Sequence, residues 1–180
     1  MNQGQRKVWE ALFMEFVFAG KREKLVGNPV EVGQTAADFT ALKRDLTPYE
    51  FYKETEGKIV VISSVPSLDT GVCEFQTTKF NEEASALSED VAIVTISCDL
   101  PFAQRRFCGA HGIDRVEVVS DHRQLSFGNA YGFAIEDVRL LARGVVVIDK
   151  NRVVRYVEYV PEASQHPDYE KAVEAISALM

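Results

Sequence analysis

The chain has 180 residues, of which 46% are hydrophobic and 26% are charged, as expected for one ordinary folded domain. A chain of this length and composition buries most of the surface that it exposes when unfolded, which excludes extensive disorder. Its 27 acidic residues outnumber its 20 basic ones, so the formal net charge is −7. Nucleic-acid binding needs a basic face that displaces counterions from phosphate, so we expect no nucleic-acid partner.

The N-terminal residues differ in character from the rest of the chain. Residues 1–13 are expected to form an extension, non-native or flexible, and residues 14–180 a single domain. Glu10 and Glu15 interrupt the apolar stretch Val8–Phe18, and no small-residue cleavage site follows it. The stretch is also too short and too charged to span a membrane. We therefore expect a soluble, cytoplasmic protein without a membrane partner.

The first half of the domain begins with β-type patterns. From Glu15 onwards, two short strands are expected around Gly20. Residues 46–54 predict a surface turn or a short helix. The continuous β-branched run Lys58–Val65 predicts a strand buried on both faces, as in a parallel sheet. A helix is expected next, and its apolar positions are Phe75, Phe80, Ala84 and Leu87.

The middle of the chain continues the alternation of strand and helix. Residues 91–96 form a second buried run. Pro101 opens the next helix, at a position where its missing N–H costs nothing, and this helix carries Phe102, Phe107 and Cys108 before a glycine at 109 or 112. A short strand is expected over residues 116–119 and a further helix over residues 123–131.

The C-terminal part predicts a hairpin and a closing helix. Gly144–Ile148 is a third buried strand, and Asp149-Lys150-Asn151 turns it into a strand over residues 153–160. Pro167-Asp168 begins the last helix, whose apolar residues recur at helical spacing. Strands that alternate with helices, followed by a hairpin, predict an α/β fold with a mixed central sheet and helices on both faces, compatible with a thioredoxin-like core.

The segment Pro66–Cys73 joins the first buried strand to its helix, and ligands in open α/β sheets bind at such carboxyl ends of strands. A thiol in the first helical turn meets unpaired backbone N–H groups and the positive end of the helix dipole, which both favour the thiolate. Thr70, three residues earlier, can donate its hydroxyl to this sulfur, and Pro66 would shape the loop and screen the sulfur from water.

Pro66–Cys73 matches the PxxxTxxC signature of the peroxiredoxins. Longer stretches resemble one branch, the thiol peroxidases, which are atypical two-cysteine peroxiredoxins: SVPSLDTGVCEFQTTKFNE (64–82), DLPFAQRRFCGAHGI (99–113), LARGVVVIDKN (141–151) and VRYVEYVPEASQHPDYEKAV (154–173). The resemblance runs from about residue 16 to the C-terminus. It implies a thioredoxin-like three-layer fold with an N-terminal β-hairpin.

The resemblance also assigns roles to individual residues. It makes Cys73 the peroxidatic cysteine, Cys108 the resolving cysteine, and Arg143 the arginine that stabilises the thiolate, although Arg143 by itself would be a surface arginine before a strand. It implies reduction of hydrogen peroxide and organic hydroperoxides without any cofactor. The intrachain disulfide Cys73–Cys108 would be recycled by thioredoxin in a homodimer. Because disulfides need Cα atoms about 4.4–6.8 Å apart, we expect local unwinding around Cys73 and residues 101–109.

Several alternatives stay open at this point. Cys98, at a strand end, is expected to be a small buried hydrophobe, and a backup resolving thiol is the alternative. A general thiol–disulfide oxidoreductase is disfavoured because the chain has no CxxC pair, while a redox sensor or holdase is an additional possibility. The scattered histidines and the cysteine spacing predict no metal site. The segment 36–40 lacks the proline found in many peroxiredoxins, which concerns packing more than chemistry.

Overall fold

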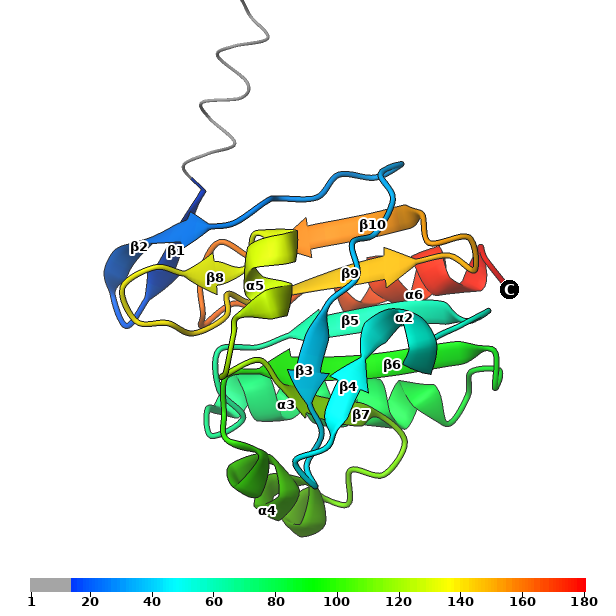
Figure 1. Cartoon of the computed structure of the whole chain (residues 1–180), viewed down its shortest axis with the longest axis horizontal. Helices are drawn as coiled ribbons and strands as arrows, with labels where there is room; N and C mark the ends of the chain where they lie inside the picture. Colours follow the sequence, from blue (N-terminus) through cyan, green and yellow to red (C-terminus); the bar gives the residue numbers. More distant parts are fainter. Residues whose placement is uncertain (1–13) are drawn as a thin grey trace, which may run out of the picture.

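A seven-stranded mixed sheet lies at the centre of the computed structural model, which describes residues 14–180 (Figure 1). The extension predicted for residues 1–13 lies outside the described residues. The strands follow the order β10-β9-β5-β6-β7-β3-β4. Their bounds are Val154–Tyr159 (β10), Gly144–Ile148 (β9), Ile59–Ser64 (β5), Val91–Ser97 (β6), Glu117–Ser120 (β7), Thr40–Leu42 (β3) and Pro48–Glu50 (β4).

The three central strands β5, β6 and β7 run parallel, and β9 and β10 form the predicted antiparallel hairpin beside β5. Every residue of β5 is buried, because its alternate side chains enter two different apolar clusters. Val60 and Ile62 face one cluster, while Ile59 and Val61 face the other. The β-branched run therefore forms a strand covered on both faces, as predicted.

A second, small sheet extends the fold at one end of the large one (Figure 1). Its strands β1 (Glu15–Phe18) and β2 (Lys21–Val26) form the expected N-terminal hairpin, and β8 (Ala134–Ile135) pairs with β2. The sequence patterns did not predict β8, since a strand of two residues has no periodicity to detect.

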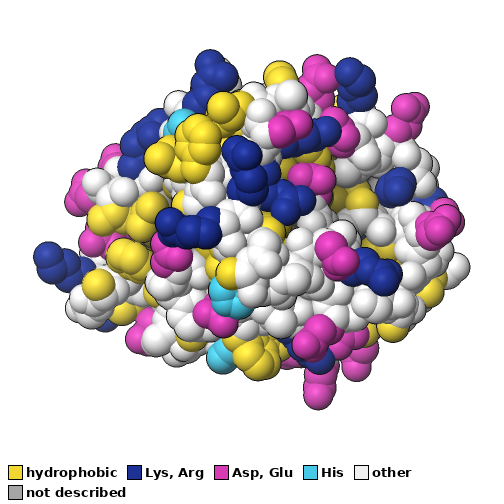
Figure 2. All heavy atoms as spheres, turned by 90° about the horizontal axis from the view of Figure 1, so that it is seen from below, with side chains coloured by type: hydrophobic (Ala, Val, Ile, Leu, Met, Phe, Trp, Pro, Cys, Tyr) yellow, Lys and Arg dark blue, Asp and Glu magenta, His cyan; other side chains and the backbone are white. Residues whose placement is uncertain are grey.

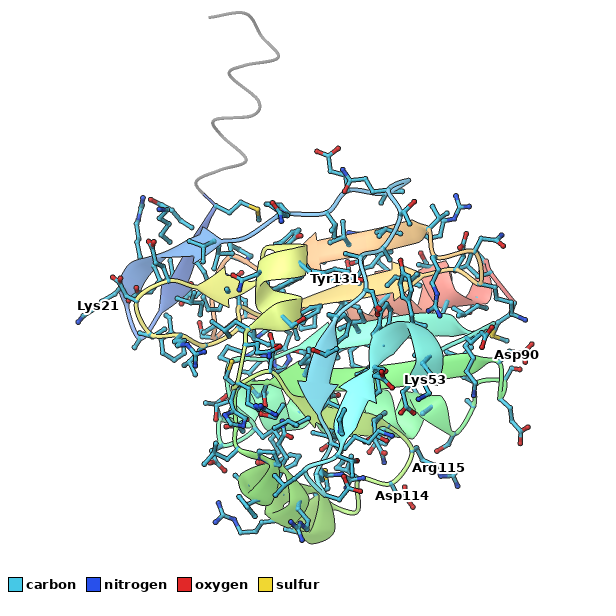
Figure 3. The ribbon with its side chains drawn as sticks, viewed as in Figure 1. Lys21, Lys53, Asp90, Asp114, Arg115 and Tyr131 are labelled. Atoms are coloured by element: carbon cyan, nitrogen blue, oxygen red, sulfur yellow. The ribbon has the colours of Figure 1, made fainter. Side chains whose placement is uncertain are left out.

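Helices cover both faces of the large sheet, which confirms the expected three-layer α/β fold. They are α2 (Phe51–Glu54), α3 (Gly71–Ala84), α4 (Pro101–His111), α5 (Ser126–Tyr131) and α6 (Tyr169–Ser177). In Figure 1, α2 and α5 lie in front of the sheet and α3 and α6 lie behind it. Tyr131 of α5 points into the protein and is fully buried, whereas Lys21 and Lys53 point outward (Figure 3).

Two residues expected on the apolar faces of helices are exposed instead. Phe75 of α3 keeps 52% of its surface and Phe102 of α4 keeps 60%. Phe75 lies at the surface against the rings of His166 and Tyr169, with ring centroids 5.0 and 5.9 Å away. On the face shown in Figure 2, hydrophobic side chains reach the surface between charged ones. Helical periodicity alone could not distinguish these two phenylalanines from the core residues Phe80 and Phe107.

No helix within residues 14–180 is both long enough and apolar enough to cross a membrane.

Two glycine substitutions are expected to change stability in opposite directions. A Cβ on Gly144 would lie 2.2 Å from the carbonyl oxygen of Glu158 and 2.4 Å from the ring of Phe133, so Gly144→Ala should destabilise the protein by at least about 2 kcal/mol. Gly109 lies within α4 with open space around it, so Gly109→Ala should stabilise the protein by about 0.5–1 kcal/mol. Urea denaturation measures the free energy of unfolding of both variants. Equal changes in this free energy would contradict the packing described around the two glycines.

Candidate active site

Cys73 lies in the first turn of α3, just beyond the carboxyl end of β5, and its side chain is completely buried. Thr70 precedes the helix in an extended conformation (φ −113°, ψ 144°) and does not use its hydroxyl to cap the backbone. The Thr70 hydroxyl instead donates to the Cys73 sulfur at 2.7 Å. The TxxC spacing therefore places a hydrogen-bond donor on the sulfur, as the sequence predicts.

Arg143 reaches the same sulfur from a distant part of the chain. It directly precedes β9, and β9 pairs with β5 so that Gly144 lies opposite Ser64 at the end of β5. The Arg143 side chain is only 1% exposed, and its Nη2 donates to the Cys73 sulfur at 3.2 Å. Antiparallel pairing of two buried strands thus brings together residues that are 70 positions apart.

The charge of Arg143 is the decisive feature of this site. Within residues 14–180, its guanidinium forms no ion pair with a carboxylate. Its other partners are neutral: the carbonyl oxygen of Ala163, at 3.1 Å from Nε and 2.7 Å from Nη2, and the Gln76 side chain. A buried cation without a counter-ion is costly, so an anionic sulfur on Cys73 complements it.

Gln76 is a site residue that the sequence analysis missed. It lies one turn after Cys73 in α3 and is fully buried. Its Oε1 accepts from Arg143 Nη1 at 2.8 Å, while its Nε2 donates to Ser63 Oγ at 2.8 Å. These bonds fix the plane of the guanidinium relative to the sulfur. Only its position three residues after Cys73, on the same side of the helix, could have indicated this role.

Pro66 and Cys108 were also predicted as site residues. Pro66 is buried in the loop between β5 and α3. Cys108 lies in α4, is 3% exposed, and belongs to the same apolar cluster as Cys73. The structure holds both as free thiols, so the predicted disulfide is not formed in this conformation.

The two other cysteines have raised pKa values. Burial raises the pKa of the Cys108 thiol, and the hydrogen bond and charge of Arg44 oppose this shift only in part. Burial, together with the charge of Asp121, raises the pKa of Cys98 to about 12. Cys98 also packs against the opposite core cluster from Cys73. Cys98 is only partly buried, not fully buried as expected, and its placement favours the role of a small hydrophobe over that of a backup resolving thiol.

No group of three His, Cys, Asp or Glu side chains among the described residues is arranged to hold a metal ion.

Comparisons with known proteins identify the family to which this chain belongs. The redoxin family model matches residues 31–173. A thiol peroxidase of Halalkalibacterium halodurans is 55% identical over 163 residues, which cover 91% of this chain and 97% of that protein. A thiol peroxidase of Bacillus subtilis is 54% identical over 166 residues, which cover 92% of this chain and 98% of that protein.

This chain belongs to the redoxin family and, within it, to the thiol peroxidases. Solved structures agree with this assignment. A peroxiredoxin-like protein of Aquifex aeolicus superposes with a TM-score of 0.85 at 36% identity, covering 93% of this chain and 98% of that one. A thiol peroxidase from Chromobacterium violaceum shares the fold at 14% identity, with a TM-score of 0.81, covering 92% of this chain and 96% of that one.

The cysteines of this redoxin are expected to differ sharply in reactivity. A thiol with a raised pKa forms its nucleophilic thiolate only at higher pH, and with a pKa of about 12 the thiolate of Cys98 is scarce at pH 7. The Thr70 hydroxyl and the Arg143 guanidinium both donate to the Cys73 sulfur, so iodoacetamide at pH 7 should modify Cys73 at least about tenfold faster than Cys98 or Cys108. Peptide mass spectrometry over time measures this order, and earlier modification of Cys98 would contradict it.

Proposed function

We propose that this chain is a thiol peroxidase that reduces hydrogen peroxide and organic hydroperoxides through the Cys73 thiolate. The single observation that carries the proposal is the contact of 3.2 Å between the buried, otherwise uncompensated guanidinium of Arg143 and the Cys73 sulfur. A guanidinium keeps its proton at any physiological pH, so it favours a negative sulfur throughout that range.

In the first step, the thiolate attacks the terminal peroxide oxygen. A sulfur–oxygen bond forms, the O–O bond breaks, and Cys73 is oxidised to a sulfenic acid. The leaving oxygen takes a proton and departs as water or an alcohol. Thr70 and Arg143 donate hydrogen bonds towards the reacting atoms, which is stabilisation by preorganised dipoles and charge. No metal or organic cofactor takes part in this proposed step.

In the second step, Cys108 resolves the sulfenic acid. The Cys108 S–H condenses with the Cys73 S–OH, a disulfide forms, and one water molecule leaves. Both cysteines lie within helices and are buried in one apolar cluster. Bond formation needs specific Cα and Cβ separations, so we propose that α4 and the start of α3 unwind locally to let the sulfurs meet.

Family membership supports the remaining proposals. We propose thioredoxin as the dithiol that reduces the Cys73–Cys108 disulfide, and antioxidant defence as the role of the cycle. We also propose the cytoplasm as the location of the protein. Exposed Leu100 and Phe102 at the start of α4 offer apolar surface for the proposed homodimer.

The alternative functions have less support. A general thiol–disulfide oxidoreductase needs a second thiol near Cys73, but Thr70 occupies the corresponding position and hydrogen-bonds to the sulfur. A redox sensor would use the same oxidation of Cys73 without rapid turnover. Peroxide-dependent NADPH oxidation in a coupled thioredoxin assay separates the peroxidase from both alternatives.

Substitution of each of the two reactive cysteines should stop the cycle at a different step. Cys73→Ser should abolish peroxide consumption, because it removes the nucleophile. Cys108→Ser should consume one equivalent of peroxide and then stop, because the sulfenic acid has no resolving thiol. Peroxide loss measured with and without thioredoxin checks both results. Full activity of Cys73→Ser would overturn the central assignment, and normal turnover of Cys108→Ser would point to Cys98.

Gln76→Glu tests the charge argument directly. It would place a carboxylate where Gln76 Oε1 now lies, 2.8 Å from Arg143 Nη1. The guanidinium would then have a counter-ion, and a second negative charge near the sulfur disfavours the thiolate. We expect the second-order rate with hydrogen peroxide at pH 7 to fall by at least about tenfold, and the rate to recover at higher pH.

The control for this variant is Gln124→Glu, which makes the same charge change at an exposed position. Its rate and pH profile should match those of the wild type. An unchanged pH profile in Gln76→Glu would contradict the role assigned to the Arg143 charge.

A further inference from the structure

A polar cluster lies between α4, the helix that carries Cys108, and the loop from Pro66 to Cys73, here called the Cys73 loop. Its centre is Asp99, two residues before α4 begins. One carboxylate oxygen of Asp99 accepts from Ser67 Oγ at 2.7 Å, and the other accepts from the backbone N–H of Leu68 at 2.8 Å. Ser67 and Leu68 belong to the loop between Pro66 and Cys73. The Asp99 carboxylate therefore holds the loop that positions Thr70.

Asp99 also accepts hydrogen bonds from residues at the ends of two central strands, through its carboxylate and its backbone carbonyl. Ser97, the last residue of β6, donates its hydroxyl to Asp99 Oδ2 at 2.7 Å. Ser120, the last residue of β7, donates its hydroxyl to the Asp99 carbonyl oxygen at 2.6 Å. Gln104, fully buried in the first turn of α4, donates from Nε2 to Ser97 Oγ at 3.1 Å and to the Val119 carbonyl at 2.8 Å.

These bonds join the two segments that carry the reacting sulfurs. Asp99 contacts neither the sulfur of Cys73 nor that of Cys108, so any effect that it has on the reaction is indirect. Hydrogen bonds to an ionised carboxylate are stronger than those between neutral groups. The hydrogen bonds of the Asp99 carboxylate therefore have two effects. They hold the loop in the conformation that suits peroxide attack, and they oppose the unwinding of this loop and of α4.

We propose that Asp99 is a positioning residue whose hydrogen bonds hold the Cys73 loop against the start of α4. Breaking of these hydrogen bonds limits the rate of disulfide formation. The proposal rests on the proposed peroxidase function. The limited step is the condensation of Cys108 S–H with Cys73 S–OH, which forms the disulfide and releases water. The peroxide consumed in the previous step is its only oxidant.

Asp99→Asn should change the two chemical steps in opposite directions. Loss of the carboxylate charge weakens three hydrogen bonds, so the sulfenic acid should convert to the disulfide about tenfold faster. Attack on peroxide should slow by a few-fold, because the loop that bears Thr70 is held less firmly. Quench-flow with a dimedone trap and mass spectrometry measures sulfenic acid and disulfide separately, with one equivalent of hydrogen peroxide.

A second readout is overoxidation. Sulfinic acid forms when a second peroxide reaches the sulfenic acid before Cys108 does. In excess hydrogen peroxide, the sulfinic fraction per turnover should fall in Asp99→Asn as the disulfide forms faster. A merely destabilised protein would lose activity without this fall.

Ser67→Ala provides a milder test if Asp99→Asn fails to fold. It removes one hydrogen bond to Asp99 Oδ1, together with the longer bond of 3.3 Å that Ser67 Oγ accepts from the Asp69 N–H, and should speed disulfide formation by about threefold. In the Asp99→Asn background, Ser67→Ala should speed disulfide formation by less than this factor, because the two residues act as one unit.

The matched control is Asp69→Asn, since Asp69 is exposed in the same loop and its carboxylate accepts no hydrogen bond from residues 14–180. Its ratio of the two rates should equal the wild-type ratio.

The possible failures are distinguishable. If the wild type forms no Cys73 sulfenic acid or no Cys73–Cys108 disulfide, the proposed function fails. If the wild type completes the cycle but Asp99→Asn and Ser67→Ala form the disulfide no faster than it does, only the role of Asp99 is overturned. Proportional slowing of both steps in these variants would likewise overturn it.

Discussion

The contact between Arg143 and Cys73 is the interaction on which the rest of the site depends. A fully buried guanidinium without a carboxylate partner is tolerated only where the surroundings satisfy its donors and offer negative charge. Gln76 and the Ala163 carbonyl take three of its hydrogen bonds, and the sulfur takes the fourth. The register of β9 against β5 fixes where the guanidinium lies, so the stability of the sheet core is also what orients the charge.

Most of the fold could be predicted because the central strands are buried on both sides. Such strands need continuous β-branched runs, and Ile59–Ser64 and Gly144–Ile148 show this pattern in the sequence. Surface position was harder to predict. Phe75 packs against rings that come from the loop before α6 and from its first turn, and no local pattern in α3 indicates that partner. Two-residue β8 depends on pairing with β2, which is also a non-local effect.

The site was predictable to the extent that its residues are close in sequence. Thr70 and Cys73 share one turn, so their spacing alone implied the hydrogen bond that the structure contains. Arg143 depends on strand pairing, and only the family resemblance identified it. Gln76 and Asp99 carry no signal of their own, because glutamines in helices and aspartates before helices are common. Their roles become visible only when packing brings their partners within hydrogen-bond distance.

The two chemical steps make opposite demands on one apolar cluster. In the proposed cycle, peroxide attack needs an anionic Cys73 beside Arg143. Burial raises the pKa of the Cys108 thiol, which favours its neutral form in the same apolar cluster. The same burial withholds Cys108 from the sulfenic acid. A conformation that suits the first proposed step is therefore poor for the second, which is the reason for the local unwinding that we propose between them. Bonds that join both segments, as those of Asp99 do, are then the natural place where the balance between attack and resolution is set.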